Sequence, residues 1–472
     1  MKGKIVTGFF WKFGEQVSSQ LVSFILSIIL ARLLTPNDYG VVALVNVFII
    51  LANVFVTSGF GTALIQKENS NEIDFSTIFY LSEAMSIIVY AIIFFLAPFI
   101  ANFYKNSEMT LILRVFALQL PISAFNSIQQ AYISKHIMFK KVFVSTTISA
   151  ILSGLIGIFM AYSDFGVWAL IGQYLSNTII VSITLALQIS WRPKLIFSWE
   201  AGKPLISFGW KILATSLLGE FFNQLRSLIL GKVYTASDLA YYNRGLRFPE
   251  LVSNNVNNTI SSVLFPVLSK YGNDFDRVKI GLRRAIRMST FILMPLLFGM
   301  MMTSKEIILL LLTKKWIAAV PYMQILCMSC IFDTVSNENI QALKSIGRSD
   351  VLLKLEILKK PIYLFLLLLG IKISVMVMAE TMVIYNVIAV LINMSPNRKF
   401  LNYSFAEQIQ DILPAFLASS FMSVIVYLVG NFSLSTGISF IVKIVCGVLS
   451  YLLIAILFRM QALKEITMYR SK

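Results

Sequence analysis

The segment Ile412–Val442, ILPAFLASSFMSVIVYLVGNFSLSTGISFIV, contains no charged residue over its whole length. A transmembrane helix needs roughly 20 apolar residues, so this segment is long enough for two passes across a bilayer. Further uncharged stretches, each as long as one pass or longer, lie at 41–66, 84–104, 142–163 and 165–191. The sequence therefore predicts a protein embedded in a membrane.

The composition of the whole chain agrees with this prediction. Of its 472 residues, 57% are hydrophobic and 13% are charged, and the mean hydropathy is +0.78, which is more apolar surface than a soluble core can hold. Alternating strand patterns are absent, which favours a helical bundle over a transmembrane barrel. The net charge of +17 raises nucleic acid as an alternative partner. The cations, however, lie in short gaps between apolar segments, where they set membrane orientation, so we expect no nucleic-acid partner.

Segmentation at charge clusters and turn residues predicts an all-α, polytopic membrane protein with about 14 transmembrane helices. If the N-terminus is cytoplasmic, most lysines and arginines fall on the cytoplasmic ends of these helices. The positive-inside rule therefore predicts that both termini are cytoplasmic. The predicted helices lie at 9–33, 41–65, 77–103, 110–134, 142–163, 166–190, 206–231, 238–268, 285–312, 317–345, 350–371, 373–394, 409–430 and 436–459.

An internal repeat links the first and the seventh predicted helices. The first opens with Trp11-Lys12 and is followed by TPNDYG at 35–40, and the seventh opens with Trp210-Lys211 and is followed by TASDLA at 235–240. An even number of passes between the copies gives both halves the same orientation, as in a parallel repeat. Chance similarity of apolar helices is the alternative. The repeat predicts an N-terminal six-helix half at 1–205, a C-terminal six-helix half at 206–395 and two additional helices at 396–472.

Five predicted helices carry polar residues along one face, which is unfavourable where a helix contacts lipid. Each charge at bilayer depth costs about 2.5–3.5 kcal/mol, so we expect these faces to line a wet central cavity between the halves, near the midplane. For any single amide, hydrogen bonding between packed helices is the alternative. The residues predicted to bind substrate are Gln16, Gln20, Asn126, Asn223, Arg226, Arg244, Arg247, Asn254 and Asn337.

The charges in this predicted cavity indicate the class of cargo. Arginine is favoured for phosphate because its planar guanidinium makes paired, charge-assisted hydrogen bonds, so a cationic cavity predicts an anionic cargo. Arg226 points off the main stripe of its helix, and both anchoring and function remain open for it. Four acidic residues are predicted either to balance the arginines or to bind a coupling cation: Glu15, Glu220, Glu250 and Asp333.

The sequence gives no support for catalysis or for a bound metal or cofactor. Cys327 and Cys330 form a CxxC inside an apolar run with no second ligand pair, which indicates packing. His136 lies in a basic loop and is expected to be solvated. Walker, dinucleotide-binding and nucleophile motifs are absent from the sequence. We therefore predict no metal, no cofactor and no enzyme activity.

The segment ARLLTPNDYG at 31–40 resembles the signature of the bacterial polysaccharide transport family. This family comprises the Wzx-type flippases of O-antigen, capsule and exopolysaccharide, in the MOP (multidrug, oligosaccharidyl-lipid, polysaccharide) superfamily. The segment SDLAYYNR at 237–244 is similar to the family's matching stretch, although Ala240 stands where the family often has glycine. The resemblance covers essentially the full chain and implies a MOP/MATE-like fold, with two pseudo-symmetric six-helix halves and two further helices.

The resemblance also implies a function in the bacterial cytoplasmic membrane. It implies a flippase that moves a polyprenyl-diphosphate-linked oligosaccharide repeat unit, of the undecaprenyl type, by alternating access during synthesis of lipopolysaccharide, capsule or exopolysaccharide. H+ and Na+ are the candidate coupling ions, and a polymerase and glycosyltransferases are the candidate partners. The alternatives within the superfamily are a peptidoglycan-precursor flippase and a MATE-type multidrug antiporter. A membrane-bound glycan polymerase or ligase is the enzyme alternative, which the short outer loops disfavour.

Overall fold

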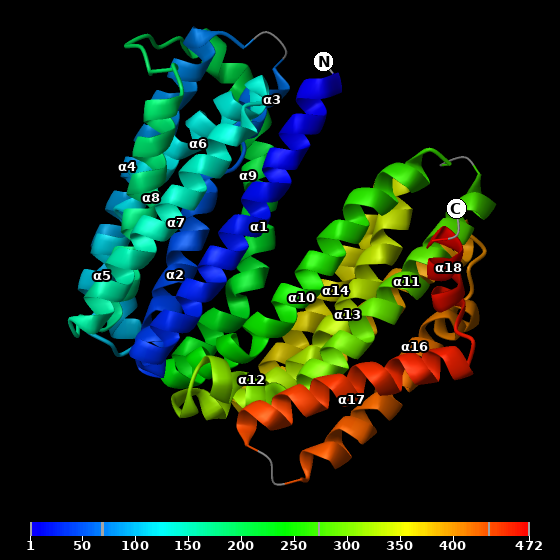
Figure 1. The fold of residues 1–472 in the computed structure, drawn as a ribbon. Coiled ribbons are helices and arrows are strands. Elements are labelled where there is room, and N and C mark those ends of the chain that lie inside the picture. The colour runs from blue at the N-terminus through cyan, green and yellow to red at the C-terminus, as the bar shows by residue number, and fades with distance from the viewer. Residues whose placement is uncertain (1, 68–69, 272–273, 433–434, 471–472) are drawn as a thin grey trace. The chain divides into compact units, whose positions relative to one another are not determined.

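The computed structural model describes residues 2–67, 70–271, 274–432 and 435–470, and these residues form helices and connecting turns without a β-strand (Figure 1). The predicted all-helical fold is confirmed. The chain divides into two compact units, Met1–Ala240 and Tyr241–Lys472. The first unit contains α1 (Lys2–Leu33), α2 (Pro36–Thr57), α3 (Phe60–Gln66), α4 (Glu72–Phe103), α5 (Met109–Phe116), α6 (Gln119–His136), α7 (Phe139–Tyr162), α8 (Val167–Gln188), α9 (Trp199–Val233) and the first turn of α10 (Ala236–Ser269). The second contains the rest of α10, α11 (Phe275–Met302), α12 (Ser304–Leu311), the 3-10 helix η1 (Lys314–Ala319), α13 (Val320–Ser345), α14 (Ser349–Ile371), α15 (Val375–Phe400), α16 (Phe405–Gly430), α17 (Thr436–Leu457) and α18 (Gln461–Arg470).

Twelve helical segments of the described residues are long and apolar enough to cross a membrane, so the chain is a multi-pass membrane protein. Every predicted helix coincides with a helical segment, and four of them consist of two consecutive helices: α2 with α3, α5 with α6, α11 with α12, and η1 with α13. The two predicted helices outside the twelve are α10 and α14. Both are long enough, but their sequences are too polar: α10 carries the run NNVNN at 254–258, and α14 has three lysines and one glutamate between 354 and 360.

The boundary between the compact units follows α9, whereas the sequence repeat places a boundary before it. Within the first unit, α9 packs against α2, α3 and α4. Close packing at the break between α2 and α3 requires glycine, because a Cβ atom at Gly59 would lie 2.2 Å from the carbonyl oxygen of Gly209, and φ of Gly59 is +94°. The predicted division into 1–205, 206–395 and 396–472 follows a sequence repeat, whereas the compact units are defined by contacts. This division therefore stays a prediction.

The two turns that suggested the repeat have the same local structure. Before α2, the backbone N–H of Thr35 donates to Asp38 Oδ2 at 2.9 Å, and the N–H of Asp38 donates to Thr35 Oγ1 at 3.3 Å. Before α10, Thr235 and Asp238 make the same reciprocal pair at 3.1 and 3.2 Å. Both are capping boxes, which satisfy backbone donors at a helix start. The turns also touch, because a Cβ at Gly40 would lie 1.8 Å from the Ala236 carbonyl oxygen.

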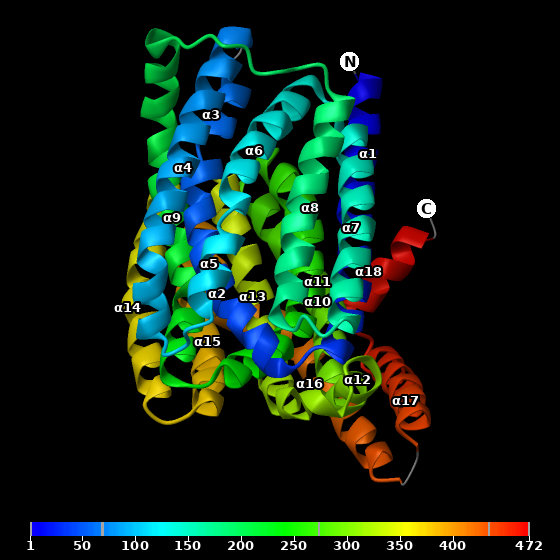
Figure 2. The same ribbon diagram turned by 90° about the vertical axis from the view of Figure 1, so that its left-hand side faces the viewer.

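Each unit has its own buried core. In the first unit, α7 lies between α1 and α8 (Figures 1 and 2), and a separate apolar cluster surrounds the buried Trp191. In the second unit, the buried Tyr403 belongs to a cluster with residues of α10, α11 and α13. Lipid is as apolar as these side chains, so helix association inside a bilayer relies on close packing and on polar pairs.

A ladder of buried amides fixes α13 against α15 in the second unit. Asn386 donates to Ser329 Oγ at 2.8 Å, Asn393 donates to Ser336 Oγ at 2.5 Å, and the Asn397 side chain donates to Asn339 Oδ1 at 2.7 Å. Asn393, Asn397 and Asn339 are completely buried. Such bonds between transmembrane helices contribute about 0.6 kcal/mol each on average, so their main effect here is to set the register of the two helices.

A buried ion pair attaches α17 to α12. Lys443 Nζ lies 2.6 Å from Glu306 Oε1, and Ser439 donates to the same oxygen at 3.2 Å. The two charged residues are only 9% and 7% exposed. The pair therefore anchors one of the two helices outside the predicted repeat.

Substitution of Lys443 tests this attachment. Lys443→Met is expected to lower the unfolding temperature of the purified protein in detergent, because removing one partner of a buried ion pair costs about 3–5 kcal/mol. The double variant Glu306→Gln/Lys443→Met removes both charges and is expected to regain most of the loss. Thermal unfolding followed by circular dichroism measures both. A double variant no more stable than Lys443→Met would contradict the assignment.

Candidate functional site

The polar faces of α10 and α13 meet in the second unit, and glycine allows their close approach. A Cβ atom at Gly245 of α10 would lie 2.7 Å from Tyr322 Cβ and 2.8 Å from the backbone nitrogen of Met323. One turn further along α10, Pro249 has no N–H, so the helix leaves a carbonyl oxygen without its usual donor. The backbone of α10 is thus both close to α13 and unusually polar at this level.

Beyond this approach, the two helices are joined by side-chain hydrogen bonds. Asn257 Nδ2 donates to Asp333 Oδ2 at 3.5 Å, and the amides of Asn337 and Gln341 both donate to Ser261 Oγ at 3.0 Å. Ser253 Oγ lies 3.4 Å from Thr334 Oγ1. The structure therefore brings together the predicted residues Asp333 and Asn337 with the polar face of α10.

Not every polar side chain of this face is used in packing. Arg247 and Asn254 lie seven residues apart on one side of α10, and both are exposed, as is Asp333 on α13. Among the residues that the structure describes, Arg247 makes no hydrogen bond or ion pair. Hydrogen bonding between helices explains Asn257 and Ser261, but it does not explain the exposed guanidinium of Arg247.

Arg244 has a different environment from Arg247. It is 9% exposed, and its guanidinium carbon lies 5.3 Å from the centroid of the Trp316 ring, a cation–π geometry. This contact holds α10 against η1. Glu250 follows one turn after Arg247, is half-buried and has an interaction partner.

Lys359 of α14 is a cation of this region that the sequence interpretation did not select. It is 5% exposed, its ammonium lies 2.6 Å from Glu356 Oε1, and it interacts electrostatically with Asp333. The polar region of the second unit therefore extends from α10 through α13 to α14. Lys359 lies beside other lysines near the predicted cytoplasmic end of its helix, a pattern that indicates membrane orientation rather than a site.

Glu338 of α13 is a second residue that sequence analysis missed. It is 1% exposed, and within the described part of the chain neither carboxylate oxygen has a hydrogen-bond partner. It lies off the polar stripe that contains Asn337, so helical periodicity gave no signal for it.

In the first unit, the predicted residues of α1 lie on a half-exposed face. Glu15 forms an ion pair with Lys12 at 2.6 Å, Gln16 is exposed, and Gln20 is half-buried. The opposite side of α1 packs on α7, where Ser18 Oγ lies 3.3 Å from Thr147 Oγ1.

The other predicted residues of the first unit lie on α6 and α9. Asn126 is 7% exposed and donates to the Thr178 carbonyl of α8 at 3.3 Å, so it lies in a seam between helices. On α9, Asn223 is exposed, Glu220 accepts from Gln224 at 2.7 Å, and Arg226 is 8% exposed. Thus Asn126 and Arg226 are buried in the first unit, whereas Gln16 and Asn223 are accessible.

The fold is that of MOP-superfamily transporters. The solved structure of the lipid II flippase MurJ in an inward closed conformation matches with a TM-score of 0.80 and 16% identity, covering 96% of this chain and 99% of that chain. An inward-facing multidrug resistance MATE family transporter of the MOP superfamily matches with a TM-score of 0.63 and 15% identity, covering 81% and 94%. At these identities the likeness concerns the fold.

Sequence comparison identifies the family. The model of the family described as "Polysaccharide biosynthesis protein" matches residues 29–321, which is more than half of the chain, and the chain belongs to this family. It is 22% identical to the teichuronic acid biosynthesis protein TuaB of Bacillus subtilis (strain 168), over 96% of this chain and 95% of that protein. It is also 22% identical to the lipopolysaccharide biosynthesis protein WzxC of Escherichia coli (strain K12), over 78% and 76%. The succinoglycan biosynthesis transport protein ExoT of Rhizobium meliloti (strain 1021) is 22% identical, over 72% and 69%. The predicted family is confirmed.

Proposed function

We propose that this protein is a flippase that moves a polyprenyl-diphosphate-linked oligosaccharide repeat unit across the bacterial cytoplasmic membrane, for the synthesis of a surface polysaccharide. Membership of the polysaccharide biosynthesis family supports the pathway, as do relatives named for teichuronic acid, lipopolysaccharide and succinoglycan. The single observation that carries the proposal for the cargo is the exposed guanidinium of Arg247 on the polar face of α10, which pairs with no residue that the structure describes.

The chemistry of the cargo fits the accessible residues of both units. A diphosphate needs cationic donors in a wet environment, and Arg247 supplies a planar fork that binds two phosphate oxygens at once. Glycan hydroxyls need neutral donors and acceptors, which the accessible amides Gln16, Asn223 and Asn254 provide. In this proposal these groups line a central cavity between the two halves, and the prenyl chain stays in lipid.

The remaining predicted charges are assigned to balance and coupling. Asp333 is proposed to compensate Lys359, with which it interacts, and Glu15 compensates Lys12. Glu220 and Glu250 are the candidates for binding a coupling H+ or Na+. Transport follows alternating access, and both termini lie in the cytoplasm. Glycosyltransferases act before the flipping step, and a polymerase acts after it.

Reconstitution tests the function directly. The purified protein in liposomes is expected to move a fluorescent polyprenyl-diphosphate-linked oligosaccharide from the inner to the outer leaflet, measured by accessibility to a membrane-impermeant enzyme. Empty liposomes and liposomes with the Arg247→Ala variant are the controls. Equal rates with and without the protein would contradict the proposal.

Two alternative cargoes of the superfamily are distinguished in cells. A peptidoglycan-precursor flippase predicts loss of viability on depletion, and a multidrug antiporter predicts drug resistance on overexpression. We expect loss of surface glycan with neither of these results. The exposed Arg247 disfavours the cationic drugs that multidrug antiporters carry.

A further inference from the structure

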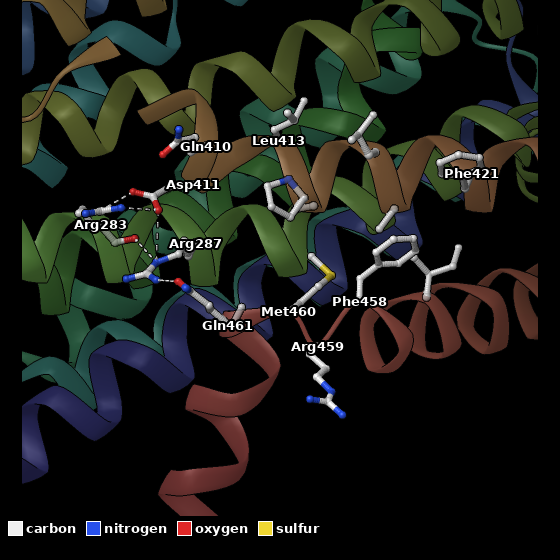
Figure 3. Close-up of a pocket in the computed structure, with 16 residues that line it drawn as sticks. Arg283, Arg287, Gln410, Asp411, Leu413, Phe421, Phe458, Arg459, Met460 and Gln461 are labelled. Atoms are coloured by element: carbon white, nitrogen blue, oxygen red, sulfur yellow. Dashed lines mark hydrogen bonds and ion pairs between the residues drawn. The ribbon is translucent and has the colours of Figure 1, made fainter. Parts of the chain in front are cut away.

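A cavity of about 650 Å³ lies within the second unit, between α11, α16, the end of α17 and α18 (Figure 3). One side of it is apolar and the other is polar. The apolar side is lined chiefly by Leu413, Leu417, Phe421, Ile454 and Phe458, and the polar side by Arg283, Arg287, Gln410, Asp411, Arg459 and Gln461. Ligand pockets in proteins commonly have volumes of about 300–1,000 Å³, and a cavity of this size accommodates a lipid headgroup and part of one acyl chain.

Among the described residues that line the cavity, the one carboxylate is already neutralised. Asp411 accepts two hydrogen bonds from Arg283, at 2.7 and 3.1 Å, and a third from the Tyr403 hydroxyl at 2.7 Å. Burial, and then this bond to Asp411, raise the pKa of the Tyr403 hydroxyl. Arg287 donates to Gln461 and lies 3.6 Å from Glu465 of α18.

Cations exceed anions around the polar side. The described residues that line the cavity include three arginines, Arg283, Arg287 and Arg459, and one carboxylate, Asp411, so the lining carries two more positive charges than negative ones. Arg459 in the turn between α17 and α18 is exposed and makes no hydrogen bond or ion pair with any described residue. Figure 3 shows its guanidinium pointing away from the network of Arg283 and Asp411.

The apolar side continues onto the outer surface of the protein. Leu413 is 44% exposed, Phe421 is 59% exposed and Phe458 is 75% exposed. In a multi-pass membrane protein these side chains contact acyl chains. The cavity therefore joins a lipid-facing surface to an excess of positive charge at the ends of α11, α16 and α17, where headgroups lie.

We propose that this cavity binds an anionic phospholipid, with one acyl chain along Leu413, Leu417 and Phe458 and the headgroup phosphate at Arg459. Basic pockets between membrane helices are suited to such headgroups. The occupant is proposed to be a phospholipid rather than the cargo, because the cavity lies inside one unit, whereas the residues proposed to bind the cargo belong to both units. The assignment goes beyond the proposed function and does not depend on it.

Native mass spectrometry of the purified full chain tests the proposal, with phosphatidylglycerol and phosphatidylethanolamine as the probes. The wild-type protein is expected to retain phosphatidylglycerol preferentially. Arg459→Gln is expected to weaken its binding about tenfold, the loss of one charge-assisted contact. The matched control is Arg398→Gln, an exposed arginine in the last turn of α15, which is expected to leave binding unchanged.

A second variant tests the apolar part without changing any charge. Leu417→Trp fills the cavity and is expected to weaken phosphatidylglycerol binding as well. Leu453→Trp is its control, at a 59% exposed position of α17 that does not line the cavity. Equal binding of the two phospholipids, or equal effects of Arg459→Gln and Arg398→Gln, would overturn the proposal. Displacement of phosphatidylglycerol by a lower concentration of polyprenyl phosphate would also overturn it, because the site would then belong to the cargo.

Discussion

Arg247→Ala is expected to abolish surface polysaccharide while the amount of protein in the membrane stays unchanged. Arg247 is exposed and makes no hydrogen bond or ion pair among the described residues, so its removal leaves no buried partner unsatisfied. In the proposed function it binds the diphosphate with paired hydrogen bonds worth about 1.5–3 kcal/mol each, and their loss predicts a fall in transport of about a hundredfold or more. Immunoblots of surface glycan and of the tagged protein measure both quantities.

A conservative substitution and a remote arginine make this test specific. Arg247→Lys keeps the charge but loses the planar fork, and it is expected to restore only part of the display. Arg398→Ala changes an exposed arginine of α15 outside the predicted site and is expected to have no effect. Normal glycan display by Arg247→Ala would remove the observation on which the proposed cargo depends.

Gly40→Ala is expected to destabilise the first unit severely, although it adds a single methyl group. The new Cβ atom would lie 1.8 Å from the carbonyl oxygen of Ala236 and 2.3 Å from its carbonyl carbon. These are backbone atoms, and the capping box of Thr235 and Asp238 holds them in place. Overpacking of this kind costs about 3 kcal/mol or more, so we expect a lower unfolding temperature and less protein in the membrane.

The matched control for Gly40 is another glycine in the same unit. Gly219 lies within α9, and a Cβ atom there would meet nothing within 4 Å. Gly219→Ala is therefore expected to be neutral or slightly stabilising, because alanine has the higher helix propensity. Equal unfolding temperatures for the two variants would show that the turns at Gly40 and Ala236 do not pack as closely as described.

The helices were predictable from sequence because a bilayer leaves the backbone few alternatives. A segment in hydrocarbon must satisfy its own N–H and C=O groups, so apolar length alone predicts a helix. The break between α2 and α3 at Gly59 was not predictable, since the surrounding run is uniformly uncharged and the cause is contact with Gly209 of α9. The packing of α9 against α2, α3 and α4 was not predictable for the same reason, because it depends on tertiary contacts.

The candidate site was predictable as a pairing of faces, but the role of each member was not. Polar residues on α10 and α13 needed partners inside a membrane, and they find each other through Asn257 and Asn337. Periodicity cannot tell the exposed Arg247 from the buried Arg244, because the difference lies in tertiary surroundings, which for Arg244 include the Trp316 ring of η1. Lys359 could not be selected from sequence, because it lies in a cluster of lysines, and such a cluster at a helix end normally indicates membrane orientation.

The amide ladder between α13 and α15 restricts how the second unit is able to move. A slide of one helical turn cannot re-form all three side-chain bonds, because Asn397 would then face Ala342 and Leu343, or, in the other direction, Asn386 would face Ile325 and Leu326. The two helices are thus expected to move together as one rigid body whenever the transporter changes conformation. Spin labels placed on opposite sides of the ladder should keep a constant separation through the whole transport cycle.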